Sequence, residues 1–260
     1  MPYTFVHCKF QPDIKQESER CLPIDGMQFI LVFVIVLMGA VLQGSLGFGL
    51  GPLAVPLLLL IDPGFIPGPM LLVSIFLTFS VFRRERSDFH KEGFGWVILG
   101  RIIGSAAGTG LLLIIPNEDL NLLYGSLIIL AVILSVSGWK LSMLPRNFLF
   151  AGSLSGMMAT AAAIGGPSMA LVYQHGSGPR LRSTLSAIFL MGSFIALIFL
   201  FIAGKLGIPE FIRALILLPG IVTGFYLSKF SKTVLDKKLL RPAILTVSFF
   251  AAVVLVINNL

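Results

Sequence analysis

The chain has 260 residues, of which 56% are hydrophobic and 12% are charged, with a mean hydropathy of +0.96. Soluble domains carry about 25% charged residues, so this composition excludes an ordinary soluble protein. Several apolar runs approach or exceed the ~20 residues that a helix needs to cross the hydrocarbon core. Because the alternating pattern of a membrane β-barrel is absent, we expect an all-α polytopic membrane protein.

The net charge of +7 would also suit a nucleic-acid-binding protein, but the basic residues lie in short loops. Two clusters, Arg83–Lys91 and Lys229–Arg241, separate apolar segments. Basic loops of this kind fix the orientation of a membrane protein by facing the cytoplasm. We therefore expect the protein to reside in the lipid bilayer, with its basic loops at the membrane surface, and we expect no nucleic-acid partner.

Residues 1–26 form a polar tail in which charged residues interrupt every apolar stretch, so it does not read as a signal peptide. Its two cysteines, Cys8 and Cys21, would pair only in an oxidising compartment. Met27 stands at the start of the first apolar segment, and we hypothesise that it is the authentic first residue. N-terminal sequencing of the native protein tests this, and a mature chain beginning upstream would contradict it.

The first apolar segment, Met27–Ile61, is interrupted by Gln43–Pro52, which holds four glycines and ends in proline. An interior glycine costs a helix roughly 1 kcal/mol relative to alanine, and an interior proline about 3. The flanking sequence is too apolar for an aqueous loop. Non-helical backbone inside a membrane survives only against protein or a water-filled cavity, so this broken helix is a candidate binding site.

Further along the chain, apolar segments alternate with short polar loops. The expected membrane spans are Pro69–Phe82, Phe94–Ile115, Leu120–Trp139, Ser183–Ala203, Phe211–Ser228 and Pro242–Ile257. A second break, Ile164–Ser168, separates Phe148–Ala163 from the short apolar leg Met169–Gln174.

The two breaks belong to an internal repeat. Gly51-Pro52 recurs 115 residues later as Gly166-Pro167, and the pair Gly104 and Gly108 recurs 116 residues later as Gly220 and Gly224. Leu122-Leu123 recurs 117 residues later as Leu239-Leu240. Three landmarks at nearly one offset predict two copies of one unit, residues 27–140 and 147–260, joined by a cytoplasmic linker, residues 141–146.

Charge predicts the relative orientation of the two copies. The loop Pro116–Asp119 is acidic, whereas its counterpart in the second copy, residues 229–238, carries four lysines. The loop Arg83–Lys91 is strongly basic, whereas its counterpart Lys205–Glu210 is not. The copies therefore face opposite sides of the membrane, as inverted-topology transporter repeats do.

The second break predicts a re-entrant hairpin, because basic residues at both of its flanks place both ends in the cytoplasm. Its legs, Phe148–Ala163 and Met169–Gln174, are only about 24 and about 9 Å long at 1.5 Å per residue. A tip near mid-membrane fits these lengths. By symmetry, Met27–Ile61 forms a matching hairpin from outside, so each repeat is a hairpin plus three spans, with both termini outside.

Two tips that face each other would place helix N-termini at the midplane, with helices expected to begin at Leu53 and Met169. A helix N-terminus carries about half a positive charge and free N–H donors, which suit an anion. The same glycines could instead serve only close helix packing, and hydroxyls could satisfy broken backbone. The candidate substrate-binding residues of the breaks are Gln43, Ser45, Gly47, Gly49, Gly51, Pro52, Thr160, Gly165, Gly166, Pro167 and Ser168.

Arg101 is a further candidate, since it is the one Lys or Arg well inside an expected span. A central charge costs roughly 2.5–3.5 kcal/mol on insertion scales. Arg101 lies beside Gly100, Gly104 and Gly108, whose spacing permits the close approach of another helix. Either Arg101 supplies positive charge to an anion path, or it extends to the cytoplasmic headgroups.

Acidic residues and histidines lie in the tail, in loops or at span ends. The sequence thus provides no carboxylate or imidazole relay for a proton pump, no metal cluster and no general base for intramembrane hydrolysis. We expect no enzyme activity, no cofactor and no catalytic residue.

The two breaks resemble the hallmarks of the TauE/SafE sulfite exporter family, also called the sulfonate-uptake permease family. The first hallmark is similar to Gln43–Pro56, and the second to Ile164–Tyr173 followed by Arg182-Ser183-Thr184. The resemblance covers residues 27–258. It implies transport of small sulfur-containing or related organic anions across the inner membrane. It singles out Gly47, Gly49, Gly51, Pro52, Gly165, Gly166 and Pro167.

This chain departs from the family pattern at the second break. Ala162 and Ala163 stand where glycine is common, and Ser168 where a second proline is frequent. The expected function is secondary transport of a small anion such as sulfite or a sulfonate, with alternating access to a site at the two tips. A passive anion channel and a membrane scaffold or assembly factor are the alternatives. The sequence leaves open the anion, the direction, the coupling ion and the oligomeric state.

Overall fold

The computed structural model describes residues 25–137, 141–173, 178–231 and 237–257, and these residues are helical or in short connections, without a strand. Three short 3₁₀ helices, Pro63–Phe65, Arg86–Asp88 and Asn117–Asp119, lie in the connections. The α-helices in chain order are α1 (Gly26–Leu46), α2 (Leu50–Leu59), α3 (Gly68–Glu85), α4 (Phe94–Ile114), α5 (Leu120–Val136), α6 (Pro145–Ala162), α7 (Gly166–Tyr173), α8 (Gly178–Ile202), α9 (Ile208–Ser231) and α10 (Lys237–Ile257). The cysteines of the tail, Met1–Ile24, lie outside the described residues.

Within the described residues, five helices are long and apolar enough to cross a membrane: α1, α4, α5 with the turn before it, α8 and α9. The all-helical membrane class expected from composition is confirmed. The expected spans over α3 and α10 are not in this set: the last turn of α3 holds Arg83 and Arg84, and for α10 only residues 245–257 are counted, as a shorter apolar helix. Large apolar side chains such as Ile198 and Leu215 are more than half exposed, which suits contact with lipid.

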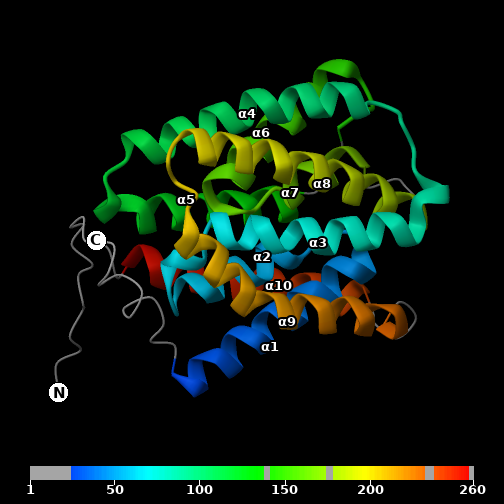
Figure 1. The fold of residues 1–260 in the computed structure, drawn as a ribbon. Helices are drawn as coiled ribbons and strands as arrows, with labels where there is room; N and C mark the ends of the chain where they lie inside the picture. Colours follow the sequence, from blue (N-terminus) through cyan, green and yellow to red (C-terminus); the bar gives the residue numbers. More distant parts are fainter. Residues whose placement is uncertain (1–24, 138–140, 174–177, 232–236, 258–260) are drawn as a thin grey trace.

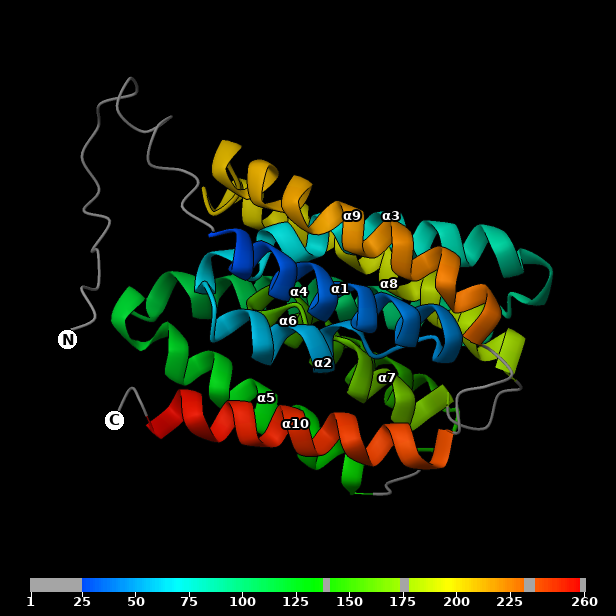
Figure 2. The same cartoon turned by 90° about the horizontal axis from the view of Figure 1, so that it is seen from below.

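The helices run roughly along one common axis, and neighbours come from different halves of the chain (Figures 1 and 2). Helix α1 packs on α9, α4 on α6, and α3 on α8, while α5 lies beside α10. Glycines bring two of these pairs together. Gly104 of α4 lies against the backbone of Ser153 in α6, and Gly220 of α9 lies against the backbone of Phe33 in α1. The close-approach role expected for the glycines of α4 is confirmed.

Both helix breaks are present, and both are short. Helix α1 ends at Leu46, and α2 begins at Leu50 after Gly47 and Gly49, whose φ angles of 91° and 133° favour glycine. Helix α6 ends at Ala162, and α7 begins at Gly166. Between them Ala163 has a φ of 56°, in the left-handed region that a glycine would occupy at less cost.

The expected helix starts at Leu53 and Met169 were wrong by three residues each, because α2 begins at Leu50 and α7 at Gly166. Pro52 and Pro167 therefore lie inside the first turn, where a missing N–H breaks no helical hydrogen bond. The Leu53 N–H already donates to the carbonyl oxygen of Gly49 at 3.1 Å.

Other boundaries were placed too far inside the helices. Helix α8 begins at Gly178 rather than Ser183, α9 at Ile208 rather than Phe211, and α10 at Lys237 rather than Pro242. Lys, Arg and Glu are good helix formers, so polar residues at the membrane surface extend these helices by about a turn. The expected end of the third span at Trp139 and of the short leg at Gln174 lie outside the described residues.

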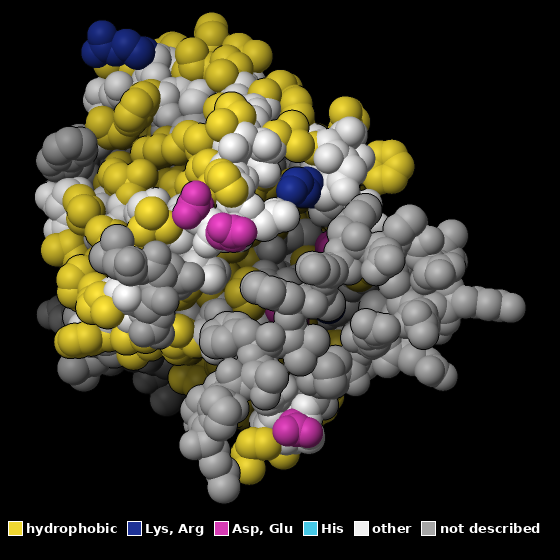
Figure 3. Space-filling view, turned by 90° about the vertical axis from the view of Figure 1, so that its left-hand side faces the viewer, with side chains coloured by type: hydrophobic (Ala, Val, Ile, Leu, Met, Phe, Trp, Pro, Cys, Tyr) yellow, Lys and Arg dark blue, Asp and Glu magenta, His cyan; other side chains and the backbone are white. Residues whose placement is uncertain are grey.

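The two ends of the bundle differ in charge. One end holds the turn Arg86–Asp88, with Arg83, Arg86 and Lys91 exposed; we call it the basic end. The opposite end holds the turns Pro63–Phe65 and Asn117–Asp119 and faces the viewer in Figure 3, where Asp and Glu side chains appear on the surface amid apolar ones. The charge difference between the loops thus corresponds to two opposite ends of the molecule.

Candidate functional site

The tips of the two hairpins are in direct contact. A Cβ atom added at Gly51 would lie 2.6 Å from the carbonyl oxygen of Ala163, so the first turn of α2 packs on the backbone of the second break. In the reverse sense, a Cβ atom added at Gly166 would lie 3.4 Å from the Cβ atom of Phe48. The two breaks, far apart in the sequence, therefore form one structural unit.

A small cavity of about 50 Å³ lies at this contact; we call it the central cavity. Its walls come from both breaks and from α3, α4 and α8. Of the candidate residues, those lining it are Gln43, Gly49, Gly51, Pro52, Arg101, Gly165 and Gly166. Among the residues that the sequence did not single out are Phe48, Ser74, Thr78, Phe189 and Ser193. The structure thus brings seven candidate residues together around one space.

Arg101 is the charged residue of the central cavity. Its side chain is 1% exposed, so it does not extend to the headgroups. One terminal nitrogen, Nη1, donates to the hydroxyl of Ser155 in α6 at 2.8 Å, and that hydroxyl donates to the Gly165 carbonyl at 2.7 Å. The guanidinium also lies over the ring of Phe189 in α8, 5.8 Å from its centre. Arg101 is therefore anchored to the second break through Ser155.

The guanidinium of Arg101 is incompletely paired. Its Nε is buried and has no hydrogen-bond partner. The ion pairs among the described residues are formed by Arg84, Arg182, Arg213 and His90, and none of them includes Arg101. A buried charge without a counter-ion is unfavourable, and an anion in the cavity would remove that cost.

Two helices from opposite halves contribute hydroxyls to the same cavity. Ser74 of α3 and Ser193 of α8 lie 3.0 Å apart between their hydroxyl oxygens, and Ser74 also donates to the Leu71 carbonyl. The hydroxyl of Thr78, one turn further along α3, is held by the carbonyls of Ser74 and Ile75. Sequence reasoning missed these residues, because a serine in an apolar helix gains meaning only once α3 and α8 are known to cross.

The remaining candidates do not line the central cavity. Ser45 lies on the far side of the first tip, and Gly47 packs against the backbone of Arg182. Thr160 is buried with an unpartnered hydroxyl, Pro167 is buried in the first turn of α7, and the Ser168 hydroxyl donates to the Gly165 carbonyl at 3.4 Å. These five positions therefore lie outside the set of residues that line the space between the tips.

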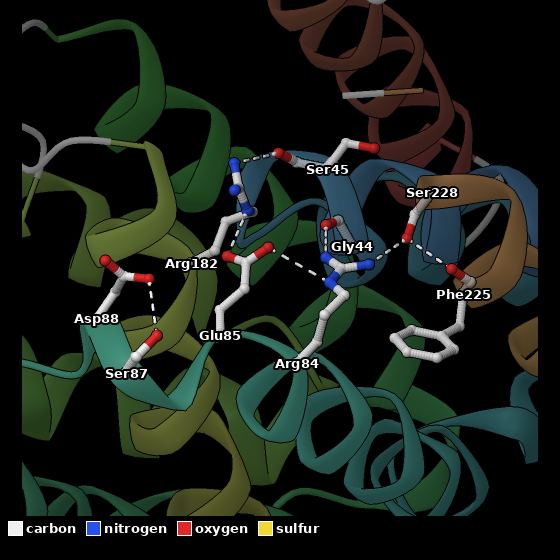
Figure 4. A network of polar contacts seen from close by, with 9 residues as sticks. All are labelled: Gly44, Ser45, Arg84, Glu85, Ser87, Asp88, Arg182, Phe225 and Ser228. Carbon is white, nitrogen blue, oxygen red and sulfur yellow. Dashed lines mark hydrogen bonds and ion pairs between the residues drawn. The ribbon is translucent and has the colours of Figure 1, made fainter. Parts of the chain in front are cut away.

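A buried ionic network lies at the basic end of the first hairpin (Figure 4). The carboxylate of Glu85, at the end of α3, accepts from Nε of Arg182 in α8 at 2.7 Å, and its other oxygen lies 3.3 Å from Nε of Arg84. Glu85 and Arg182 are both less than one-tenth exposed. We call these three residues the Arg84–Glu85–Arg182 cluster.

The cluster holds the end of α1. Arg84 donates to the Gly44 carbonyl at 2.5 Å and to the Ser228 hydroxyl at 3.0 Å, and Arg182 donates to the Ser45 carbonyl at 3.3 Å. Cations at a helix C-terminus satisfy orphan carbonyls and oppose the negative end of the helix dipole. The sequence assigned Arg84 and Glu85 to an orienting loop, and their partners in α8 and α9 lie nearly a hundred or more residues away.

At the opposite end a looser contact links the two halves. The guanidinium of Arg213 in α9 lies 3.5 Å from the carboxylate of Asp62, and both side chains are about one-third exposed. Asp62 also accepts from the Gly64 N–H at 2.8 Å. Exposed ion pairs of this kind contribute little to stability, so this end is tied less firmly than the basic end.

Comparison with known proteins gives one match. The family model described as Sulfite exporter TauE/SafE matches residues 31–255, which includes both breaks, Arg101 and the Arg84–Glu85–Arg182 cluster. No curated protein and no solved structure matches the chain. The family match covers most of the chain and agrees with the resemblance seen in the two glycine-rich breaks. The chain belongs to the sulfite exporter TauE/SafE family of membrane transporters.

Proposed function

We propose that this protein is a secondary transporter of a small anion such as sulfite or a sulfonate, which binds in the central cavity between the two hairpin tips. The observation that carries the proposal is the buried, incompletely paired guanidinium of Arg101 at that cavity. The family supplies the coarser frame of a membrane transporter. The substrate, the position of the site and the mechanism are the proposal.

The electrostatics of the cavity favour an anion. A lone charge in the membrane interior is costly, and evolution retains such residues chiefly where they act on substrates or ions. Arg101 presents one buried Nε–H without a protein acceptor. An oxyanion beside the guanidinium would both neutralise the charge and accept this hydrogen bond, and charge-assisted bonds are the strong ones.

The helix breaks add partial positive charge. The first residues of α2 (Gly51 and Pro52) and of α7 (Gly166) line the cavity together with Gly49 and Gly165. The first N–H groups of a helix have no intrahelical acceptor, and the helix dipole favours an anion there. The N-termini of α2 and α7 would therefore add partial positive charge to that of Arg101 around an anion in the central cavity.

Alternating access fits the helix pairing. If residues 27–140 and 147–260 are inverted repeats, α1 corresponds to α6 and α4 to α9, so the contact of α1 with α9 has the contact of α6 with α4 as its counterpart. Likewise α2 packs on α10 and α7 on α5. Such matched pairs support a pseudo-two-fold arrangement, in which rocking of one repeat against the other exposes the central site to each side in turn.

The proposed setting is the inner membrane, with the basic end in the cytoplasm by the positive-inside rule. The anion then crosses between the basic end and the end that holds Asp62 and Asp119. Since the described membrane interior holds no carboxylate relay beside Arg101, any proton coupling would depend on ionisation of the substrate itself.

Flux measurements with the purified full-length chain in liposomes test the proposal. Sulfite uptake should saturate, and sulfite preloaded inside should accelerate exchange of labelled sulfite, because a carrier returns faster when loaded. Uptake without saturation or exchange would favour the channel. No flux of sulfite, sulfate or ethanesulfonate, with a co-purifying protein instead, would favour the scaffold.

A further inference from the structure

We propose a second anion subsite on the basic side of the first hairpin tip, in which Arg182 is the cation and is paired with Glu85 while no anion is bound. The inference rests on the proposed function in that it assumes an anionic substrate. The ligand class is a small oxyanion, with room for an apolar substituent.

The subsite is a cavity of about 200 Å³, larger than the central cavity. Ser45, Arg182 and Gly178 line it on its polar side, and Leu46, Leu181 and Leu245 form apolar walls. Ser45 is 3% exposed, and its hydroxyl is buried without a hydrogen-bond partner. Nearly all buried polar groups in folded proteins are paired, so an unpartnered hydroxyl beside a guanidinium points to an absent ligand.

Two helix N-termini meet at this cavity. Gly49 and Pro52 belong to the start of α2, and Gly178 and Leu181 belong to the first turn of the 25-residue helix α8. The positive ends of both helix dipoles therefore lie beside the guanidinium of Arg182. This is the combination of free N–H groups and cationic charge that binds oxyanions at helix starts.

Glu85 would compete with a bound anion for the guanidinium of Arg182. Its carboxylate accepts from Nε of Arg182 at 2.7 Å, the same kind of contact that an oxyanion would make. Arg84 lies on the other side of Glu85, 3.3 Å away, so the carboxylate retains a cationic partner when Arg182 turns to an anion. The three side chains carry two positive charges and one negative, so the cluster can accept one further anion.

The second cavity and the central cavity share a wall. Phe48, Gly49 and Pro52 line both, so the first hairpin tip separates them. Gly49 has a φ of 133°, and Gly47 lies against the backbone of Arg182. An anion held by Arg182 is therefore separated from Arg101's cavity only by the tip, and the ring of Phe48 is part of that barrier.

The test is calorimetric titration of the purified full-length protein with sulfite and, separately, with ethanesulfonate, in Arg101→Gln. This background removes the charge of the central cavity. Adding Glu85→Gln should tighten the residual binding about tenfold, because it removes a charged competitor for Arg182. Adding Arg182→Gln to that double variant should abolish binding. Glu92→Gln, which changes a half-exposed carboxylate at the same end, is the matched control and should leave affinity unchanged.

Each variant is first checked for a single size-exclusion peak and native helix content. Where Arg182→Gln does not fold, Arg182→Lys replaces it; it keeps the charge, loses the guanidinium fork, and should weaken binding several-fold. If neither Glu85→Gln nor the Arg182 substitutions change the affinity for sulfite or ethanesulfonate in the Arg101→Gln background, the second subsite is wrong. Sulfite flux that survives Arg101→Gln would instead contradict the proposed function, so the two failures are distinguishable.

Discussion

The guanidinium of Arg101 occupies the space that a side chain at Gly192 would fill. A Cβ atom at Gly192 would overlap Nε and the central carbon of that guanidinium. Helix α8 therefore makes room for the arginine of α4 at a position next to Ser193, which lines the central cavity together with Arg101. The Arg101 guanidinium in the first half of the chain can therefore take this position only because residue 192, in the second half, is a glycine.

Gly192→Ala should displace the Arg101 guanidinium and reduce sulfite flux at least about tenfold, since a misplaced charge-assisted hydrogen bond costs roughly 1.5–3 kcal/mol. Initial uptake rates in liposomes, normalised to folded protein, measure this. Gly95→Ala and Gly110→Ala are matched controls, because nothing lies within 4 Å of a Cβ at either position. Equal rates in Gly192→Ala and the controls would contradict the assigned role of Arg101.

Substitution of the tip glycines should be asymmetric. Gly51→Ala places a methyl group against the Ala163 carbonyl and forces the backbones of the two tips apart, whereas Gly166→Ala meets only the Phe48 side chain at ordinary close range. We expect Gly51→Ala to abolish most transport and Gly166→Ala to retain most of it. Uptake by both variants beside the wild type checks this, and similar losses in both would show that the tips do not touch as described.

Ala163→Gly should stabilise the protein. An L-residue in the left-handed region costs roughly 1–2 kcal/mol, and glycine avoids this at an entropic cost of about 0.5–1 kcal/mol. A rise in melting temperature in detergent is the expected result. Ala162→Gly is the control, because Ala162 ends the helix α6 in ordinary helical geometry and its replacement should lower the melting temperature. A fall in both variants would mean that Ala163 carries no strain.

The orientation is testable with single cysteines in a chain where Cys8 and Cys21 are replaced by serine. Ser87 and Asn117 are exposed at opposite ends of the bundle. A membrane-impermeant maleimide should label Asn117→Cys in intact cells, and Ser87→Cys only after lysis. The reverse pattern would place the basic end outside and overturn the assignment from charge.

Sequence patterns predicted the breaks and singled out Arg101, because glycine, proline and a charge within an apolar run act locally. They placed the starts of α2 and α7 three residues late, after the Gly-Pro steps, whereas both helices include the proline in their first turn. The left-handed backbone of Ala163 at the second break was not predicted, because an alanine gives no local sign of that conformation.

The long-range parts of the site could not be predicted in this way. The contact of Ser74 with Ser193, and that of Glu85 with Arg182, depend on how α3 crosses α8. An arginine at a helix end reads in sequence as an orienting charge, whether it faces headgroups or, like Arg182, is buried beside a carboxylate. Only the packing distinguishes these cases.

The most direct test of the central claim is calorimetric titration of sulfite into purified wild-type protein and into Arg101→Gln, with Arg213→Gln as the control. Arg213 is a partly exposed arginine at the end of the bundle opposite the basic end, outside the central cavity. Arg101→Gln should fold normally but lose tight sulfite binding, whereas Arg213→Gln should retain it. Unchanged tight binding in folded Arg101→Gln would contradict the central site.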